Sequence, residues 1–136
     1  MQARTKTRLV ALFIVFAVAP VVAVVSASWI HVKGGAWEPD ASVMARLQAD
    51  IPAYVKAQAS ERGTTLRPWH EYRFQYQGRV EDEQRIVYVN AFCHKTQVEH
   101  LDTQFVVVLD GGACFFNAVY DPAKRRFLDV RFNGMG

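Results

Sequence analysis

Residues 69–93, WHEYRFQYQGRVEDEQRIVYVNAFC, decide the fold, because apolar and polar side chains alternate along them as they do along β-strands. A first strand is expected at 72–77, and the acidic cluster that follows Gly78 reads as a turn before a second strand at 85–93. Three more strands are expected at 104–109, 113–120 and 126–132, joined by a tight hairpin at 110–112 and a turn at 121–124. This half of the chain therefore predicts a five-stranded antiparallel meander.

One long helix is expected before this sheet. Apolar residues recur three or four positions apart between residues 43 and 55, Asp40 is suited to cap the start, and Gly63 is suited to end the helix. Pro52 lies inside this pattern and cannot donate a main-chain hydrogen bond, which predicts either a kink or a second helix start capped by Asp50. The fold class is thus α+β, with the helix packed on one face of the sheet.

The amino terminus has the character of a membrane segment. Arg4, Lys6 and Arg8 precede an apolar run at residues 9–25, which can be extended to residue 30 with Trp29 at an interfacial position. This length favours an uncleaved transmembrane helix. A cleaved signal peptide is the alternative, because the small residues around Ala27 suit a signal peptidase.

Three parts are expected along the chain. Residues 1–30 form the basic start and the anchor or signal peptide, residues 31–39 with Gly34 and Gly35 form a linker, and residues 40–136 form the folded domain. The basic start keeps the amino terminus in the cytoplasm. The domain is then expected outside the cytoplasm, on a single-pass protein of the inner (cytoplasmic) membrane, or in the periplasm if the chain is cleaved near Ala27.

The charge argues against nucleic-acid binding. The three basic residues at the amino terminus account for the whole net charge of +3, so the rest of the chain is formally neutral and shows no basic stripe. No G-x-S-x-G, H-E-x-x-H or C-x-x-C motif occurs. The sequence thus predicts no catalytic residues and no cofactor, and it leans away from an enzyme.

The expected sheet has apolar side chains on both faces. Val87 and Val89, with Phe115 and Val119, are expected on the face opposite to Ile86. One helix covers only one face, so the second face must meet the membrane-proximal segment, a second copy or another protein. A sheet curled upon itself is the alternative. Val87, Val89, Phe115 and Val119 are therefore the predicted partner face.

Cys93 and Cys114 fall at opposite ends of this predicted meander. They end the second strand and begin the fourth, which run parallel on either side of the third, so a disulfide would require a different topology. The meander therefore favours two buried, unpaired cysteines. A disulfide is the alternative, as is usual in exported domains.

The loop at residues 93–102 is the best candidate for chemistry. His94, Glu99, His100 and Asp102 are side chains of the kinds that bind zinc or copper. Their spacing matches no established ligand pattern, and a polar loop between strands has this composition anyway. These four residues are thus weak metal candidates, and a solvated loop is the favoured interpretation.

The order of one helix followed by a meander, over residues 40–133, resembles the cystatin-like and NTF2-like architectures. The carboxyl half, with DGGACFF at 110–116, YDP at 120–122 and RFNG at 131–134, also resembles uncharacterised exported or membrane-anchored bacterial proteins. These resemblances imply an α+β fold and an exported location, and they imply no activity.

Three functions remain open. The first is a non-enzymatic module that binds another protein of the cell envelope. The second is a metal-binding or enzymatic domain that uses the loop from His94 to Asp102. The third is a structural homodimer formed through the second apolar face.

Overall fold

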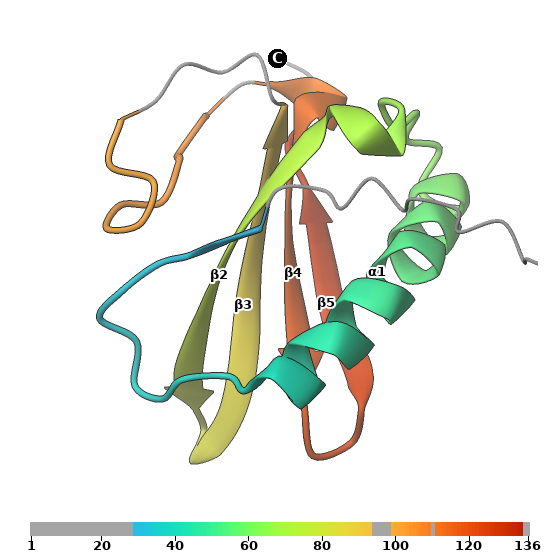
Figure 1. Ribbon diagram of the computed structural model, residues 1–136. Helices are drawn as coiled ribbons and strands as arrows, with labels where there is room; N and C mark the ends of the chain where they lie inside the picture. The colour runs from blue at the N-terminus through green and yellow to red at the C-terminus, as the bar shows by residue number, and fades with distance from the viewer. Residues whose placement is uncertain (1–28, 94–98, 110, 135–136) are drawn as a thin grey trace, which may run out of the picture.

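The computed structural model describes residues 29–93, 99–109 and 111–134. They form an α+β fold in which a single helix packs on a five-stranded mixed sheet, as Figure 1 shows. The elements in chain order are β1 (Trp29–His31), α1 (Ala41–Glu61), the short 3-10 helix η1 (Trp69–Glu71), β2 (Tyr72–Glu81), β3 (Gln84–Cys93), the 3-10 helix η2 (Gly112–Cys114), β4 (Phe115–Asp121) and β5 (Arg126–Phe132).

The strands lie in the order β1-β2-β3-β4-β5. Strands β2 to β5 form an antiparallel meander of four strands instead of the expected five, and β1 pairs with β2 in parallel, with Trp29 opposite Phe74 and His31 opposite Tyr76. The sheet is therefore mixed rather than wholly antiparallel. A parallel neighbour is possible because the chain passes through α1 before it returns to the sheet as β2.

The predicted strand at 104–109 is not a strand of the sheet. Strands β3 and β4 pair directly with each other, with Phe92 opposite Phe115. Residues 99–109 connect these two strands along the chain but are not part of the sheet. The predicted hairpin at 110–112 is wrong for the same reason, because the segment before it has no strand to pair with in the sheet. Asp110 lies outside the described residues.

Helix α1 begins and ends as its sequence indicates. The Asp40 side chain accepts a hydrogen bond of 2.8 Å from the main-chain N–H of Val43, and Gly63 has a left-handed φ of 64° just beyond the helix. Pro52 lies inside one continuous helix, so the alternative of a second start at Asp50 is wrong. Figure 1 shows that the helix changes direction about halfway along, as expected of a proline kink.

The core lies between α1 and one face of the sheet. Leu47, Ile51 and Val55 of α1 are fully buried there, and they meet aromatic and aliphatic side chains from β2 to β5. Phe74 and Phe116 are two of the large aromatic members of the core, and their rings meet edge to face at 6.3 Å. The helical periodicity in the sequence therefore identified the side of α1 that builds the core.

Residues 32–39, expected as part of a linker, fold against the sheet. Val32 is 1% exposed, its main-chain N–H donates to the carbonyl of Tyr76 at 2.9 Å, and Ala36 donates to the carbonyl of Gly78 at 2.9 Å. A side chain at position 78 would collide with the main chain of Trp37, so glycine is needed for this close approach. The described fold therefore begins at β1, not at residue 40.

The amino-terminal residues 1–28 lie outside the described part of the chain. Trp29 and Ile30, expected at the end of the membrane segment, belong to β1. Within residues 29–93, 99–109 and 111–134, no helix is long and apolar enough to cross a membrane.

Candidate binding surface

Residues 99–109, the covering segment, lie over the sheet face opposite to α1. Figure 1 shows α1 on one side of the sheet and this segment on the other. Its first part is held by Lys33, whose main-chain N–H donates to the carbonyl of Asp102 at 2.8 Å and whose ammonium donates to the Asp102 carboxylate at 2.9 Å. The cover of the second face is thus a segment of the chain itself, but it is neither the membrane-proximal segment nor a curled sheet. Part of this segment was expected to be a strand of the sheet.

Gln75, at the centre of β2, holds the covering segment to the sheet. Its side chain is completely buried, and its Nε2 donates to the carbonyls of Leu101 at 2.8 Å and Gln104 at 2.6 Å. Its Oε1 accepts from the main-chain N–H of Val106 at 2.9 Å. The amide therefore supplies the donors and the acceptor that a neighbouring strand would otherwise supply.

Two asparagines continue this row of amides across the sheet. Asn90 lies opposite Gln75 on β3, and Asn117 lies opposite Asn90 on β4. Asn90 donates to the carbonyl of Val106 at 2.9 Å and to Gln75 Oε1 at 3.0 Å, and it accepts from Asn117 Nδ2 at 2.7 Å. Such a connected row of satisfied amides fixes the covering segment in one position.

The covering segment is bonded along one edge only. The main-chain groups that point to the sheet belong to every second residue. The carbonyl of Gln104 and the N–H and carbonyl of Val106 are bonded to side-chain amides, and the carbonyl of Val108 accepts from Asn133 Nδ2 at 2.7 Å. Within the described parts of the chain, the main-chain N–H and C=O of Phe105, Val107 and Leu109 make no hydrogen bond to protein. We call these main-chain groups the outer edge.

The covering segment also carries the most exposed large apolar side chains among the described residues. Val107 is 80% exposed and Leu109 is 90% exposed, whereas Val106, whose main chain is bonded to Gln75 and Asn90, is 8% exposed. Exposed apolar groups side by side on an extended segment are a feature of interaction sites. The apolar surface that the sequence placed on the second sheet face is therefore displayed by this segment instead.

Phe105 packs the middle of the segment against Tyr88 and Arg79. Its ring meets the ring of Tyr88 edge to face at 5.2 Å, and the Arg79 guanidinium lies 3.9 Å from the Tyr88 centroid and 5.1 Å from that of Phe105. Burial raises the pKa of Tyr88 above its ordinary value, although Arg79 and Arg131 oppose the increase. Tyr88 is therefore neutral at physiological pH and acts here as a packing surface.

The disulfide between Cys93 and Cys114 closes the loop that contains the covering segment. Their Cα atoms lie 5.1 Å apart, and both cysteines are bonded, so the expectation of free thiols is wrong. The reason is topological. Because β3 and β4 are direct neighbours, the end of one lies beside the start of the other.

The four residues of the predicted partner face do not form one surface. Val87 and Val89 point toward α1 and are fully buried in the core. Phe115 and Val119 alternate along β4 with the residues that belong to the core, so they lie outside this core, and each is half-buried. The error in the alternation arose because β3 and β4 were aligned through a strand that is absent from the sheet.

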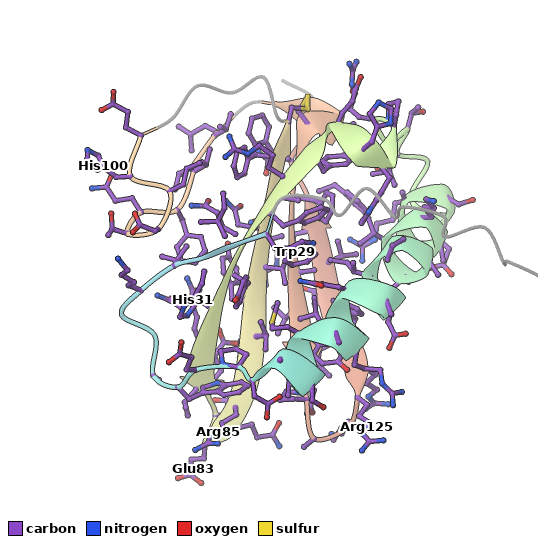
Figure 2. All side chains as sticks on the ribbon, viewed as in Figure 1. Trp29, His31, Glu83, Arg85, His100 and Arg125 are labelled. Atoms are coloured by element: carbon purple, nitrogen blue, oxygen red, sulfur yellow. A yellow bond between two sulfur atoms is a disulfide. The ribbon has the colours of Figure 1, made fainter. Side chains whose placement is uncertain are left out.

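Three of the four weak metal candidates, Glu99, His100 and Asp102, lie in the described part of the chain, and they form no metal-binding group there. His94 lies outside the described residues. His100 Nε2 lies 3.9 Å from Glu99 Oε2, and Asp102 pairs with Lys33, which lowers the pKa of Asp102 through the hydrogen bond and the charge. Figure 2 shows His100 at the outer end of the covering segment. Within the described ranges, no group of three metal-binding side chains occurs.

Hollows lie both beside this surface and at the end of α1. A pocket of about 200 Å³ follows the part of the second face that the covering segment leaves open, with Arg79, Tyr88, Asp129 and Arg131 among its lining residues. A larger one of about 370 Å³ lies past the end of α1, beside Arg62 and Phe132. Arg62 donates to the carbonyl of Val130 at 2.7 Å, and Arg131 donates to the Asp129 carboxylate at 3.2 Å. Both guanidinium groups therefore already have a partner within the protein.

A scan against protein-family models found no match to this chain, and searches of the curated proteins and of the solved structures found no match either. The geometry of the covering segment is therefore the main indication of function.

Proposed function

We propose that this chain is a non-enzymatic protein-binding module of the cell envelope, in which residues 99–109 form the binding element. One observation carries the proposal: Val107 and Leu109 are 80% and 90% exposed on a segment whose opposite side is fixed by buried amides. A segment whose main chain is already fixed loses less conformational freedom when a partner covers its apolar side chains.

The proposed location is outside the cytoplasm, with the apolar run at residues 9–25, before β1, as membrane anchor or, after cleavage near Ala27, as part of a signal peptide. The disulfide between Cys93 and Cys114 supports this location, because structural disulfides persist in oxidising compartments. The disulfide and the amides act together. The disulfide holds the two ends of the loop that contains the covering segment, and the amides fix the position of the segment on the sheet.

The test is affinity capture of the tagged full-length chain after mild cross-linking in cells, with two matched double variants. Val107→Lys with Leu109→Lys places charges on the covering segment. Val80→Lys with Leu128→Lys is the control, because these are the other exposed large apolar residues of the described ranges, 50% and 44% exposed.

We expect the first double variant to reduce the yield of the cross-linked partner at least tenfold and the control to leave it unchanged. Such a loss corresponds to about 1.4 kcal/mol or more of binding free energy. Equal yields from the wild type and the Val107 and Leu109 variant would refute the proposal. A product that contains only this chain would replace it with the homodimer.

A further inference from the structure

We infer that the partner binds as an extended strand that adds to the outer edge formed by Phe105, Val107 and Leu109. This inference rests on the proposed function and specifies how the same surface works. Addition of a strand to an exposed edge derives its affinity from main-chain hydrogen bonds and its specificity from alternate side chains.

The main chain of the covering segment has the arrangement of an edge strand. In an extended chain, the N–H and C=O of one residue point to the same side, and those of the next residue point to the other side. Gln104, Val106 and Val108 use the inner side, where side-chain amides take the place of a neighbouring strand. The outer side, at Phe105 and Val107, has main-chain donors and acceptors in the order that a strand requires, and no described residue bonds to them.

The side chains define the chemistry of the partner. Residues 103–109 carry no charge, and Val107 and Leu109 are exposed. A partner strand with uncharged, β-branched or aliphatic side chains therefore fits, because it buries these two side chains without leaving a charge unpaired. The segment also contains neither proline nor lysine, the residues that commonly block an exposed edge.

The size of the edge favours a peptide segment over a second copy of this chain. A stable interface between folded proteins uses about 20–30 residues from each side. The outer edge lies within residues 105–109, so two copies that met only here would separate readily. An extended segment of another protein needs only this short edge, since it orders along the edge as it binds.

The test uses a defined strand probe and the full chain in detergent micelles. The probe is a synthetic peptide of alternating threonine and valine with a lysine at each end. Its matched control has the same sequence with the four central residues N-methylated, so that neither side of the peptide can donate main-chain hydrogen bonds. Binding is measured by titration, and protection of the Val107 N–H is measured by amide hydrogen exchange.

A pair of protein variants tests the same contact from the other side. Val107→Pro removes the N–H of the outer edge and keeps an extended main chain, whereas Val107→Thr keeps the N–H and the branched shape. Neither substitution removes one of the amides that fix the segment.

We expect saturable binding of the probe with a Kd below about 1 mM and slower exchange of the Val107 N–H in the complex. N-methylation of the probe and Val107→Pro should each weaken binding at least tenfold, and Val107→Thr should keep it. Absence of saturable binding, or equal binding of the N-methylated peptide, would overturn strand addition. If the cross-linked partner is still lost with the lysine variants, the proposed function stands and only this mode of binding fails.

Discussion

Gln75 has more influence on the second face than any other single side chain described above. Replacement by leucine keeps the approximate volume but leaves the carbonyls of Leu101 and Gln104 and the N–H of Val106 without their partner. Because each unsatisfied buried group costs about 1–3 kcal/mol, we expect Gln75→Leu to lower the free energy of unfolding by about 3 kcal/mol. Denaturation by urea measures this loss.

Gln77→Leu is the matched control for this prediction. Gln77 lies two residues further along β2, is half-buried, and donates to the carbonyl of Lys33 at 3.0 Å instead of to the covering segment. We expect this variant to cost under about 1 kcal/mol. If both glutamine variants lose the same stability, the special role of Gln75 is disproved.

The tyrosines make the fold sensitive to alkali. Burial raises the pKa of all five above the ordinary value of 10.0. Tyr72 is 1% exposed and its hydroxyl donates to the carbonyl of Ala113, while the N–H of Arg67, which donates to the same hydroxyl at 3.1 Å, opposes the increase in pKa. The folded state thus holds these protons more tightly than the unfolded state does.

The sign of the pH dependence follows from this difference in pKa. The contribution of the tyrosines to stability is complete below about pH 10 and is lost as the pH rises through their folded-state pKa values. We expect the free energy of unfolding to decrease above pH 10 and the tyrosine absorbance change at 295 nm to coincide with unfolding. Tyrosine ionisation at pH 10 in a chain that stays folded would contradict the expectation.

At the level of single residues, the sequence identified the helix core but not the amides. Leu47, Ile51 and Val55 are buried as their spacing indicates. Gln75 is a polar residue in a stretch where polar and apolar residues alternate, and this pattern alone predicts that its side chain faces solvent. Only the pairing register shows that Gln75, Asn90 and Asn117 form one row across three strands.

At the level of elements, α1 and strands β2 to β5 follow from periodicity and turn residues, whereas β1 and the covering segment do not. β1 is three residues long and occurs where an apolar membrane segment was expected to end. Residues 104–109 do have the apolar composition of a strand. Their main-chain partners are side chains of distant residues, which local sequence patterns do not reveal.

The disulfide is the element-level feature with the largest predicted effect. Cys93 and Cys114 are separated by 21 positions, and closing a loop of this length stabilises a fold by about 3 kcal/mol through the entropy of the unfolded chain. We expect the double variant Cys93→Ser and Cys114→Ser to lose about this amount in urea denaturation. Proteolysis within residues 99–109 should also become faster.

Reductant provides the control for the disulfide prediction. It should weaken the wild type and leave the double serine variant unchanged. Alkylation of the non-reduced chain in denaturant gives an independent answer, since labelling of either cysteine would show that the bond is not formed in the cell.

At the level of the whole molecule, the folded domain begins close to the proposed membrane segment. Only Ser26, Ala27 and Ser28 separate the apolar run from β1, and three extended residues span about 10 Å. An anchored domain would therefore stay next to the lipid surface, because residues 32–39 fold against the sheet instead of forming a spacer.

The anchor makes a prediction for the protein in cells. We expect the tagged chain to sediment with membranes, to resist extraction with alkaline carbonate, and to retain the full mass of 15.4 kDa apart from the tag. Mass spectrometry of the extracted protein measures the last point. A soluble product that starts at Ser28 would instead support cleavage after Ala27 and exclude the anchor.

The short interval before β1 also links proteolytic processing to the rate of folding. A peptidase binds its substrate as an accessible extended chain on both sides of the scissile bond, and the residues directly after Ala27 include Trp29, whose ring stacks on Phe74 at 4.4 Å. Once β1 has docked, Trp29 is paired with β2 and is no longer part of a free extended chain. Release of the domain would then be decided by a kinetic competition during export, in which rapid docking of β1 preserves the precursor and slow docking permits its maturation.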